Sequence, residues 1–327
     1  MKIGIIGCGL VVENSHLPTL IAMGFEIIWV FDSNKEREKK IAQLIGIKNY
    51  VTKNDFIENA EPDIILIAVP YGLRKGIYKK LENNFLNSSI FIEKPIALTL
   101  KEHLEIESLR KNTKIGVNYN RRTYGILSKI NQIINNKIFG NIIEISFTYG
   151  GFGIKTGGKY YSNKNISGGG TFFEVGIHNV DFILHLLKPT QIEVNKVKIE
   201  YINHFDVDVD ASMNLLYNNK NIPLNFIVSN LRILDNICKI QFENAFIEYS
   251  LFNQDGIIIY ANDNTKITSI DLDFLIPCKV FDTQYLIWKD FVDGINKDDQ
   301  NYTNLITSRL TTDFIEKVYS AGEEKLI

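Results

Sequence analysis

Three residues of this sequence have side chains suited to proton transfer: Lys94, Glu174 and His178. Glu174 and His178 are four residues apart in a segment with helical periodicity, so their side chains would share one face of a helix. Histidine has an unperturbed pKa near neutrality, which suits proton transfer to or from a hydroxyl while a hydride moves. In the segment "IFIEKPIAL" a strand-like run ends in Glu93, Lys94 and Pro95, and Lys94 would project beyond the carboxyl end of that strand, where open α/β sheets bind ligands.

Each of these residues also has a purely structural interpretation. Lys94 would then be an exposed surface lysine, and His178 a partly buried histidine paired with Glu174 for packing. The position of Lys94 and the adjacent Pro95 favour the catalytic interpretation. A metal site is not predicted, because the sequence does not place the third and fourth ligands that such a site needs.

A second group of residues indicates a dinucleotide site at the N-terminus. Lys2 to Ile6 has the composition of a short buried strand, and Gly7 and Gly9 permit a tight turn directly after it. Asn14 and Ser15 are helix-initiating residue types, so the sequence predicts a strand, a glycine turn and a helix. Such a turn lets a pyrophosphate approach the N–H groups at the start of the helix.

Asp32 would bind the adenosine ribose of the same cofactor. It follows the strand-like run "WVF" about two dozen residues after the glycines, where a carboxylate accepts hydrogen bonds from both ribose hydroxyls. Because that carboxylate would repel a 2′-phosphate, NAD is predicted over NADP, while Lys35 and Arg37 nearby keep NADP possible. Two features weaken the motif: Val12 replaces the third glycine, and Asp32 could instead cap the next helix.

The order of the predicted elements indicates an α/β protein with two domains. In residues 1–120, apolar strand-like runs alternate with charged helical segments, which is typical of a doubly wound parallel sheet. In residues 121–327, strands follow strands, and clear helical patterns occur at 171–187, 283–295 and 303–322. We therefore expect a C-terminal α+β domain with an open, mostly antiparallel sheet, and a length of 327 residues suits two domains.

The composition argues against several classes of partner and against a membrane-spanning protein. The net charge of -2 argues against a nucleic-acid partner, and no apolar run reaches the roughly 18 residues that a membrane span needs. Cys8, Cys238 and Cys278 are scattered, so neither a disulfide framework nor a zinc site is suggested. The sequence predicts a soluble, cytoplasmic protein that acts on a small molecule.

The segments "GCGLVVENSHLP", "EKP" and "GGGTFFEVGIHNVD", in this order and spacing, resemble the Gfo/Idh/MocA family of oxidoreductases over nearly the whole chain. The resemblance implies a Rossmann domain, NAD(P), sugar, polyol or sugar-nucleotide substrates, and homodimers or homotetramers formed through the C-terminal sheet. By motif, Lys94 corresponds to the family's EKP lysine and His178 to its catalytic histidine. Two positions depart from the family: Glu174 stands where many members have aspartate, and Arg74 where many have histidine.

The complete predicted site comprises a cofactor set and a substrate set. The cofactor set is Gly7, Gly9, Leu10, Val11, Asp32, Pro70, Glu93 and Lys94. The substrate set is Asn118, Arg121, Lys159, Tyr160, Glu174 and His178, of which Lys159 and Tyr160 lie in a glycine-rich segment ahead of the catalytic helix. His16, His103, His185 and His204 have no partner pattern and are interpreted as structural.

The predicted function is hydride transfer between a nicotinamide cofactor and a secondary alcohol or ketone of a sugar derivative. Two alternatives remain open from the sequence. One is an NAD-dependent glycosidase that oxidises its substrate transiently and produces no net NADH. The other is a non-catalytic NAD(H)-binding regulatory protein, which the presence of Lys94 and His178 disfavours.

Overall fold

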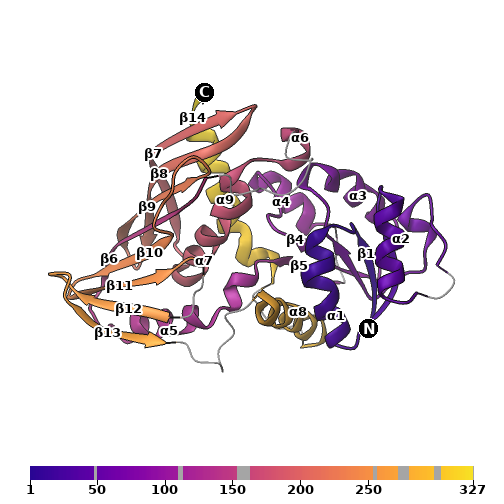
Figure 1. Cartoon of the computed structure of the whole chain (residues 1–327), viewed down its shortest axis with the longest axis horizontal. Coiled ribbons are helices and arrows are strands. Elements are labelled where there is room, and N and C mark those ends of the chain that lie inside the picture. The colour runs from indigo at the N-terminus through magenta and orange to yellow at the C-terminus, as the bar shows by residue number, and fades with distance from the viewer. Residues whose placement is uncertain are drawn as a thin grey trace. The chain divides into compact units, whose positions relative to one another are not determined.

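The computed structural model describes residues 1–47, 50–109, 113–152, 163–252, 256–271, 280–297 and 303–326. The chain divides into two compact units (Figure 1). The first comprises Met1–Asn120 and Lys279–Arg309, and the second comprises Arg121–Cys278 and Leu310–Ile327. No helix among the described residues is long and apolar enough to cross a membrane.

A five-stranded parallel sheet forms the centre of the first unit. Its strands are β1 (Lys2–Ile6), β2 (Glu26–Phe31), β3 (Ile64–Ile67), β4 (Ser89–Glu93) and β5 (Ile115–Asn118), in the order β2-β1-β3-β4-β5. Every pair is parallel, so the carboxyl ends of all five strands lie at one edge of the sheet. The predicted doubly wound domain is confirmed.

Helices flank this sheet, and one of them comes from a distant part of the chain. They are η1 (Val12–His16), α1 (Leu17–Ala22), α2 (Lys35–Leu44), α3 (Arg74–Leu81), α4 (Leu100–Glu107) and α8 (Val280–Lys297). Ile287, Trp288 and Phe291 of α8 are fully buried in one cluster with Ile3 and Phe91. Residues 279–309 therefore belong to the first unit and not, as the sequence predicted, to the second, because the apolar face of α8 completes this core.

A nine-stranded sheet forms most of the second unit within the described residues. Its order is β13-β12-β11-β10-β6-β9-β8-β7-β14, and only β6–β9 and β7–β14 are parallel pairs. The strands are β6 (Ile142–Gly150), β7 (Gln191–Ile202), β8 (Phe205–Tyr217), β9 (Lys220–Ser229), β10 (Ile237–Phe242), β11 (Ala245–Ser250), β12 (Gly256–Ala261), β13 (Lys266–Asp271) and β14 (Glu323–Leu326). The mostly antiparallel sheet is confirmed, although the sequence pattern missed β10, β13 and β14.

Helices cover one face of this sheet. They include η6 (Phe172–Gly176), α7 (Ile177–Leu187) and the part of α9 (Leu305–Ala321) that follows Arg309, and the unit also contains α5 (Gly125–Asn135) and α6 (Lys164–Ser167). Phe172 stacks on Phe226 of β9 with ring centres 5.6 Å apart, and Phe226 in turn stacks on Phe147 of β6 at 5.2 Å. Phe314 of α9 packs against Phe226 at 5.8 Å. These rings anchor the start of the η6–α7 segment, which carries Glu174 and His178, on the sheet.

Candidate active site

The glycine turn has the geometry that a close ligand approach requires. Gly7 has a φ of +101°, and a Cβ added to it would lie 2.4 Å from the Ala68 carbonyl oxygen, so no larger residue fits. A Cβ added to Gly9 would meet no heavy atom within 4 Å, which leaves open space over the turn. The N–H groups of Val12 and Glu13 donate to the Gly9 carbonyl, so the helix begins before Asn14, earlier than the sequence predicted.

Two apolar side chains next to this turn face solvent. Leu10 is 73% exposed and Val11 is 41% exposed. Together with the open space over Gly9, they form a surface that the predicted dinucleotide would cover. The residues present therefore fit the cofactor that the sequence implies.

Asp32 joins the glycine turn to the start of α2. Its carboxylate accepts hydrogen bonds from the Cys8 N–H and the Asn34 N–H, each at 2.7 Å. The helix cap is a different residue, because the Asn34 side chain accepts from the N–H groups of Glu36 and Arg37 at 3.1 Å. Asp32 is thus held beside the turn and remains partly exposed, as a ribose-binding carboxylate would be.

Arg74, one of the two departures from the family pattern, is buried and ties two strand ends together. Its guanidinium donates to the Val69 carbonyl at 3.0 Å, the Glu93 carbonyl at 2.7 Å and the Pro95 carbonyl at 2.6 Å. The Glu93 and Pro95 carbonyls lie on either side of Lys94. The Val69 carbonyl precedes Pro70, which follows β3. Arg74 therefore fixes the backbone on both sides of Lys94.

Glu93 belongs to a buried polar network that the sequence analysis did not find. The His16 Nε2 atom lies 2.6 Å from the Glu93 Oε1 atom, and the His16 Nδ1 atom accepts a hydrogen bond from the Trp288 indole N–H. Because an indole N–H only donates, Nε2 carries the imidazole proton and donates it to Glu93. Burial acts to raise the pKa of the Glu93 carboxyl, yet hydrogen bonds from His16 and Asn118 and the charge of Lys94 together lower it.

Asn118 lies in the same network, at the end of β5. It is almost fully buried, and its amide nitrogen donates to Glu93 at 2.7 Å and to Gln284 of α8 at 3.2 Å. Those contacts occupy the donors of the amide, although the sequence predicted Asn118 as a substrate residue. Its Oδ1 atom is buried and has no hydrogen-bond partner among the described residues, so a substrate role for Asn118 stays a prediction beside its contact with Glu93.

In the second unit, a buried carboxylate fixes the start of the predicted catalytic helix. Asp206 of β8 accepts hydrogen bonds from the Gly170 N–H at 2.5 Å, the Phe172 N–H at 2.7 Å and the Tyr319 hydroxyl at 2.9 Å. A Cβ on Gly170 would lie 2.1 Å from the Asp206 carbonyl oxygen, which explains a glycine there. Glu174 follows one turn later, and its N–H donates to the Gly170 carbonyl.

Glu174 and His178 are both partly exposed, and further polar groups lie close to them. The Arg121 guanidinium donates to the side-chain oxygen of Asn179, the neighbour of His178. Tyr149, at the end of β6, has a raised pKa, first because it is buried and then because of Glu174, while Arg121 opposes the shift. Tyr149 was not predicted; its place as the last side chain of a strand before the glycine-rich segment was the available signal.

Arg122 and Asp181 make a buried ion pair that supports α7. The two side chains form a double hydrogen bond with distances of 2.8 and 2.6 Å, and Thr311 of α9 donates to the same carboxylate at 2.7 Å. His185 lies in this field, and its pKa is lowered to about 4 by burial and then by Arg122. A neutral His185 fits the structural role predicted for it.

The predicted residues thus form two groups. Gly7, Gly9, Leu10, Val11, Asp32, Pro70, Glu93, Lys94 and Asn118 belong to the first unit, and Arg121, Glu174 and His178 belong to the second. Lys159 and Tyr160 lie outside the described residues, as does Cys278. Among the residues that the structure describes, no cluster of three or more histidine, cysteine or acidic side chains could hold a metal ion.

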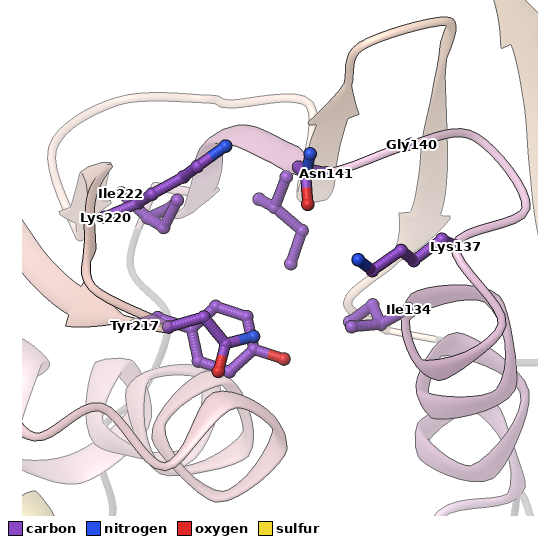
Figure 2. A pocket seen from close by; sticks show the side chains of 9 residues that line it. Ile134, Lys137, Gly140, Asn141, Tyr217, Lys220 and Ile222 are labelled. Atoms are coloured by element: carbon purple, nitrogen blue, oxygen red, sulfur yellow. The ribbon is translucent and has the colours of Figure 1, made fainter.

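A surface pocket in the second unit contains none of these residues. It lies between the end of α5 and the β8–β9 hairpin (Figure 2). Its lining consists of Ile134, Lys137, Gly140, Asn141, Ile142, Tyr217, Asn218, Lys220 and Ile222. It therefore contributes nothing to the predicted acid–base chemistry.

These features define a nucleotide-binding α/β protein of two domains: a glycine turn at the edge of a parallel sheet, an acidic residue after the second strand, and a second domain with an open sheet. The chain belongs to the Gfo/Idh/MocA family of oxidoreductases. Residues 1–119 match the oxidoreductase family with an NAD-binding Rossmann fold, and residues 127–233 match the GFO/IDH/MocA C-terminal domain.

Known relatives are distant in sequence and close in fold. Oxidoreductase P35 of Formosa agariphila is 27% identical over 62% of this chain and 66% of its own length. Glucose-6-phosphate 3-dehydrogenase of Bacillus subtilis is 26% identical over 57% of this chain and 54% of its own length. The chain thus matches between about half and two thirds of the length of these relatives. KijD10, a 3-ketoreductase from Actinomadura kijaniata solved with NADP and TDP-benzene, superposes with a TM-score of 0.82, covering 100% of this chain and 99% of its own, at 12% identity.

Proposed function

We propose that this protein is an NAD(P)-dependent sugar dehydrogenase or ketoreductase that acts on a CH–OH group of a sugar, polyol or sugar nucleotide. The observation that carries the proposal is the glycine turn: Gly7 admits no side chain, Gly9 leaves open space, and Asp32 is held beside both. Membership in an oxidoreductase family with an NAD-binding fold supports the same chemistry.

The bound cofactor would supply or accept the hydride at nicotinamide C4. The turn at Gly7 and Gly9 would bind the pyrophosphate, and Asp32 would accept hydrogen bonds from the ribose hydroxyls. Lys94 would stabilise negative charge on the reacting oxygen and orient the substrate hydroxyl. His178 would take the hydroxyl proton during oxidation and return it during reduction, with Glu174 holding the imidazole or a substrate hydroxyl.

A sugar or sugar nucleotide is supported by the names of the relatives. One is a glucose-6-phosphate 3-dehydrogenase, and a structural neighbour is a 3-ketoreductase crystallised with a TDP derivative. Arg121 and Lys159 would contribute positive charge to the substrate site, and Tyr160 would contribute an aromatic ring that can stack on a sugar or base. NAD is the proposed cofactor, because Asp32 carries negative charge at the position that a 2′-phosphate would approach.

We propose a homodimer or homotetramer built on the large sheet of the second unit. Side chains on β6, β9 and β10 alternate between buried and partly exposed, and the partly exposed set includes Ser146, Ile227 and Lys239. A face of this kind can pair with its copy. Light scattering coupled to gel filtration measures the assembly, and a monomer at micromolar concentration would contradict it.

The proposed function is tested by mixing the protein and NAD or NADH with a panel of polyols, aldoses, keto sugars and nucleotide sugars. A net change in NADH absorbance with at least one member is expected. Product formation without net NADH would favour the glycosidase alternative. Tight cofactor binding with no turnover on any compound would favour the regulatory alternative.

A further inference from the structure

Glu38 is a buried carboxylate at the ribose end of the cofactor site, and the proposed chemistry does not use it. It lies on the inner face of α2, and its side chain has no exposed surface. Its Oε2 atom accepts hydrogen bonds from the Asp32 N–H and from Lys35 Nζ, each at 2.8 Å. Its Oε1 atom accepts from the Tyr50 hydroxyl. A buried carboxylate needs such partners, because an unpaired charge removed from water is costly.

Lys35 is the cation whose position near Asp32 left NADP possible. Besides Glu38, its ammonium group donates to the Lys53 carbonyl at 2.8 Å and lies 4.4 Å from the centre of the Phe31 ring. Two of its three N–H donors are thus used by the protein, and the aromatic ring occupies a further side. The ammonium group is therefore held by three protein groups, while 41% of the Lys35 side chain is exposed to solvent.

The charges of Asp32 and Glu38 act on the same turn. The Cys8 N–H donates to Asp32, and the pKa of the Cys8 thiol is raised to about 12, first by burial and then by the charges of Asp32 and Glu38. Asp32 is thus hydrogen-bonded to the turn through the Cys8 N–H and to Glu38 through its own N–H, so Glu38 is linked to the turn through the backbone of Asp32.

We propose that Glu38 determines cofactor specificity: by holding Lys35 in an ion pair and fixing the backbone of Asp32, it selects NAD against NADP. This inference rests on the proposed function, because it requires that a dinucleotide binds at the glycine turn. Discrimination against NADP would then depend on a buried residue that does not touch the cofactor. Lys35 would bind the 2′-phosphate only when Glu38 no longer holds it.

The test measures Kd for NAD and NADP by calorimetry on the full chain. Glu38→Gln keeps the length and an acceptor for Asp32 but removes the charge that holds Lys35. NADP should then bind about tenfold tighter, which is the strength of one charge-assisted hydrogen bond, while the Kd for NAD stays within about threefold. Adding Lys35→Met to that variant should abolish the gain. Glu36→Gln, an exposed carboxylate in the same turn, is the matched control and should leave the NAD to NADP ratio unchanged.

Lys35→Met in the otherwise native chain gives a second, gentler test, because it leaves Glu38 in place. Both Kd values should stay within about twofold, since Glu38 and the Lys53 carbonyl hold the Lys35 ammonium group in the native chain. An unchanged ratio in Glu38→Gln, a gain that survives Lys35→Met, or a selective loss of NADP affinity in the Lys35→Met single variant would each overturn the inference. If the native chain binds neither dinucleotide, the proposed function itself fails.

Discussion

Replacing Asp206 by asparagine should change how the stability of the protein depends on pH. Burial raises the pKa of the Asp206 carboxyl from 3.8 to about 6, although hydrogen bonds from Phe172, Gly170 and Tyr319 act in the opposite direction. The folded state therefore binds the Asp206 proton more tightly than the unfolded state does. The stability that this tighter proton binding gives the folded state is fully present below pH 3.8 and is lost as the pH rises through about 6.

The magnitude follows from the two pKa values. A difference of about two pKa units corresponds to about 3 kcal/mol in the free energy of unfolding. The native protein should therefore gain up to that amount, relative to Asp206→Asn, between about pH 7 and pH 4. The variant should also be less stable at every pH by about 1–3 kcal/mol, because an amide replaces one of two acceptor oxygens with a donor that faces backbone N–H groups.

Urea denaturation of both proteins at pH values from 4 to 7.5, followed by circular dichroism, measures this difference. Taking native minus variant at each pH removes the contributions of all other titrating groups. Asp210→Asn, which removes an exposed carboxylate from the same strand, controls for the loss of a charge. If the stability difference between the native protein and Asp206→Asn is constant from pH 7 to pH 4, the argument that burial dominates at Asp206 is refuted.

Three further predictions concern the two halves of the site. Gly7→Ala should raise the Kd for NAD at least tenfold by calorimetry, because its Cβ would meet the Ala68 carbonyl at 2.4 Å; unchanged binding would contradict the role of the turn. Arg74→Met should lower the free energy of unfolding by about 3 kcal/mol in urea melts, because it removes the hydrogen bonds that Arg74 donates to three carbonyls. A loss below 1 kcal/mol would contradict this stabilising role of Arg74. Glu174→Asp should lower kcat about tenfold by moving the carboxylate, whereas Glu174→Gln should also shift the acidic limb of the pH–rate profile to lower pH; full activity in both would make Glu174 a bystander.

Short-range patterns predicted much of the fold. The parallel sheet, the glycine turn and the position of Asp32 follow from segments in which strand, turn and helix signals are adjacent in the chain. The mostly antiparallel second sheet followed from repeated strand-like runs. β10 escaped notice because Ile237–Phe242 mixes a lysine and a glutamine into a run of only six residues.

Long-range contacts could not be predicted in this way. His16 had no partner in the sequence, because its partner Glu93 is 77 residues away and its other neighbours lie on α8. The Asp206 clamp on Gly170 likewise joins a strand to a turn that precedes it by 36 residues. Side-chain types suggested which residues could do chemistry, but burial and partners depend on tertiary packing, which a single sequence does not reveal.

We propose that hydride passes between a nicotinamide cofactor and a carbon of a sugar derivative, with Lys94 acting on the reacting oxygen. The most direct test of this proposal is reduction of a responsive keto sugar with NADH deuterated at the transferred C4 position, followed by mass spectrometry of the product. One deuterium in the product is expected for each NADH consumed, together with about a 10²-fold slower transfer in Lys94→Ala and an unchanged Kd for NADH. Product that carries no deuterium, or undiminished transfer by Lys94→Ala, would contradict the proposal.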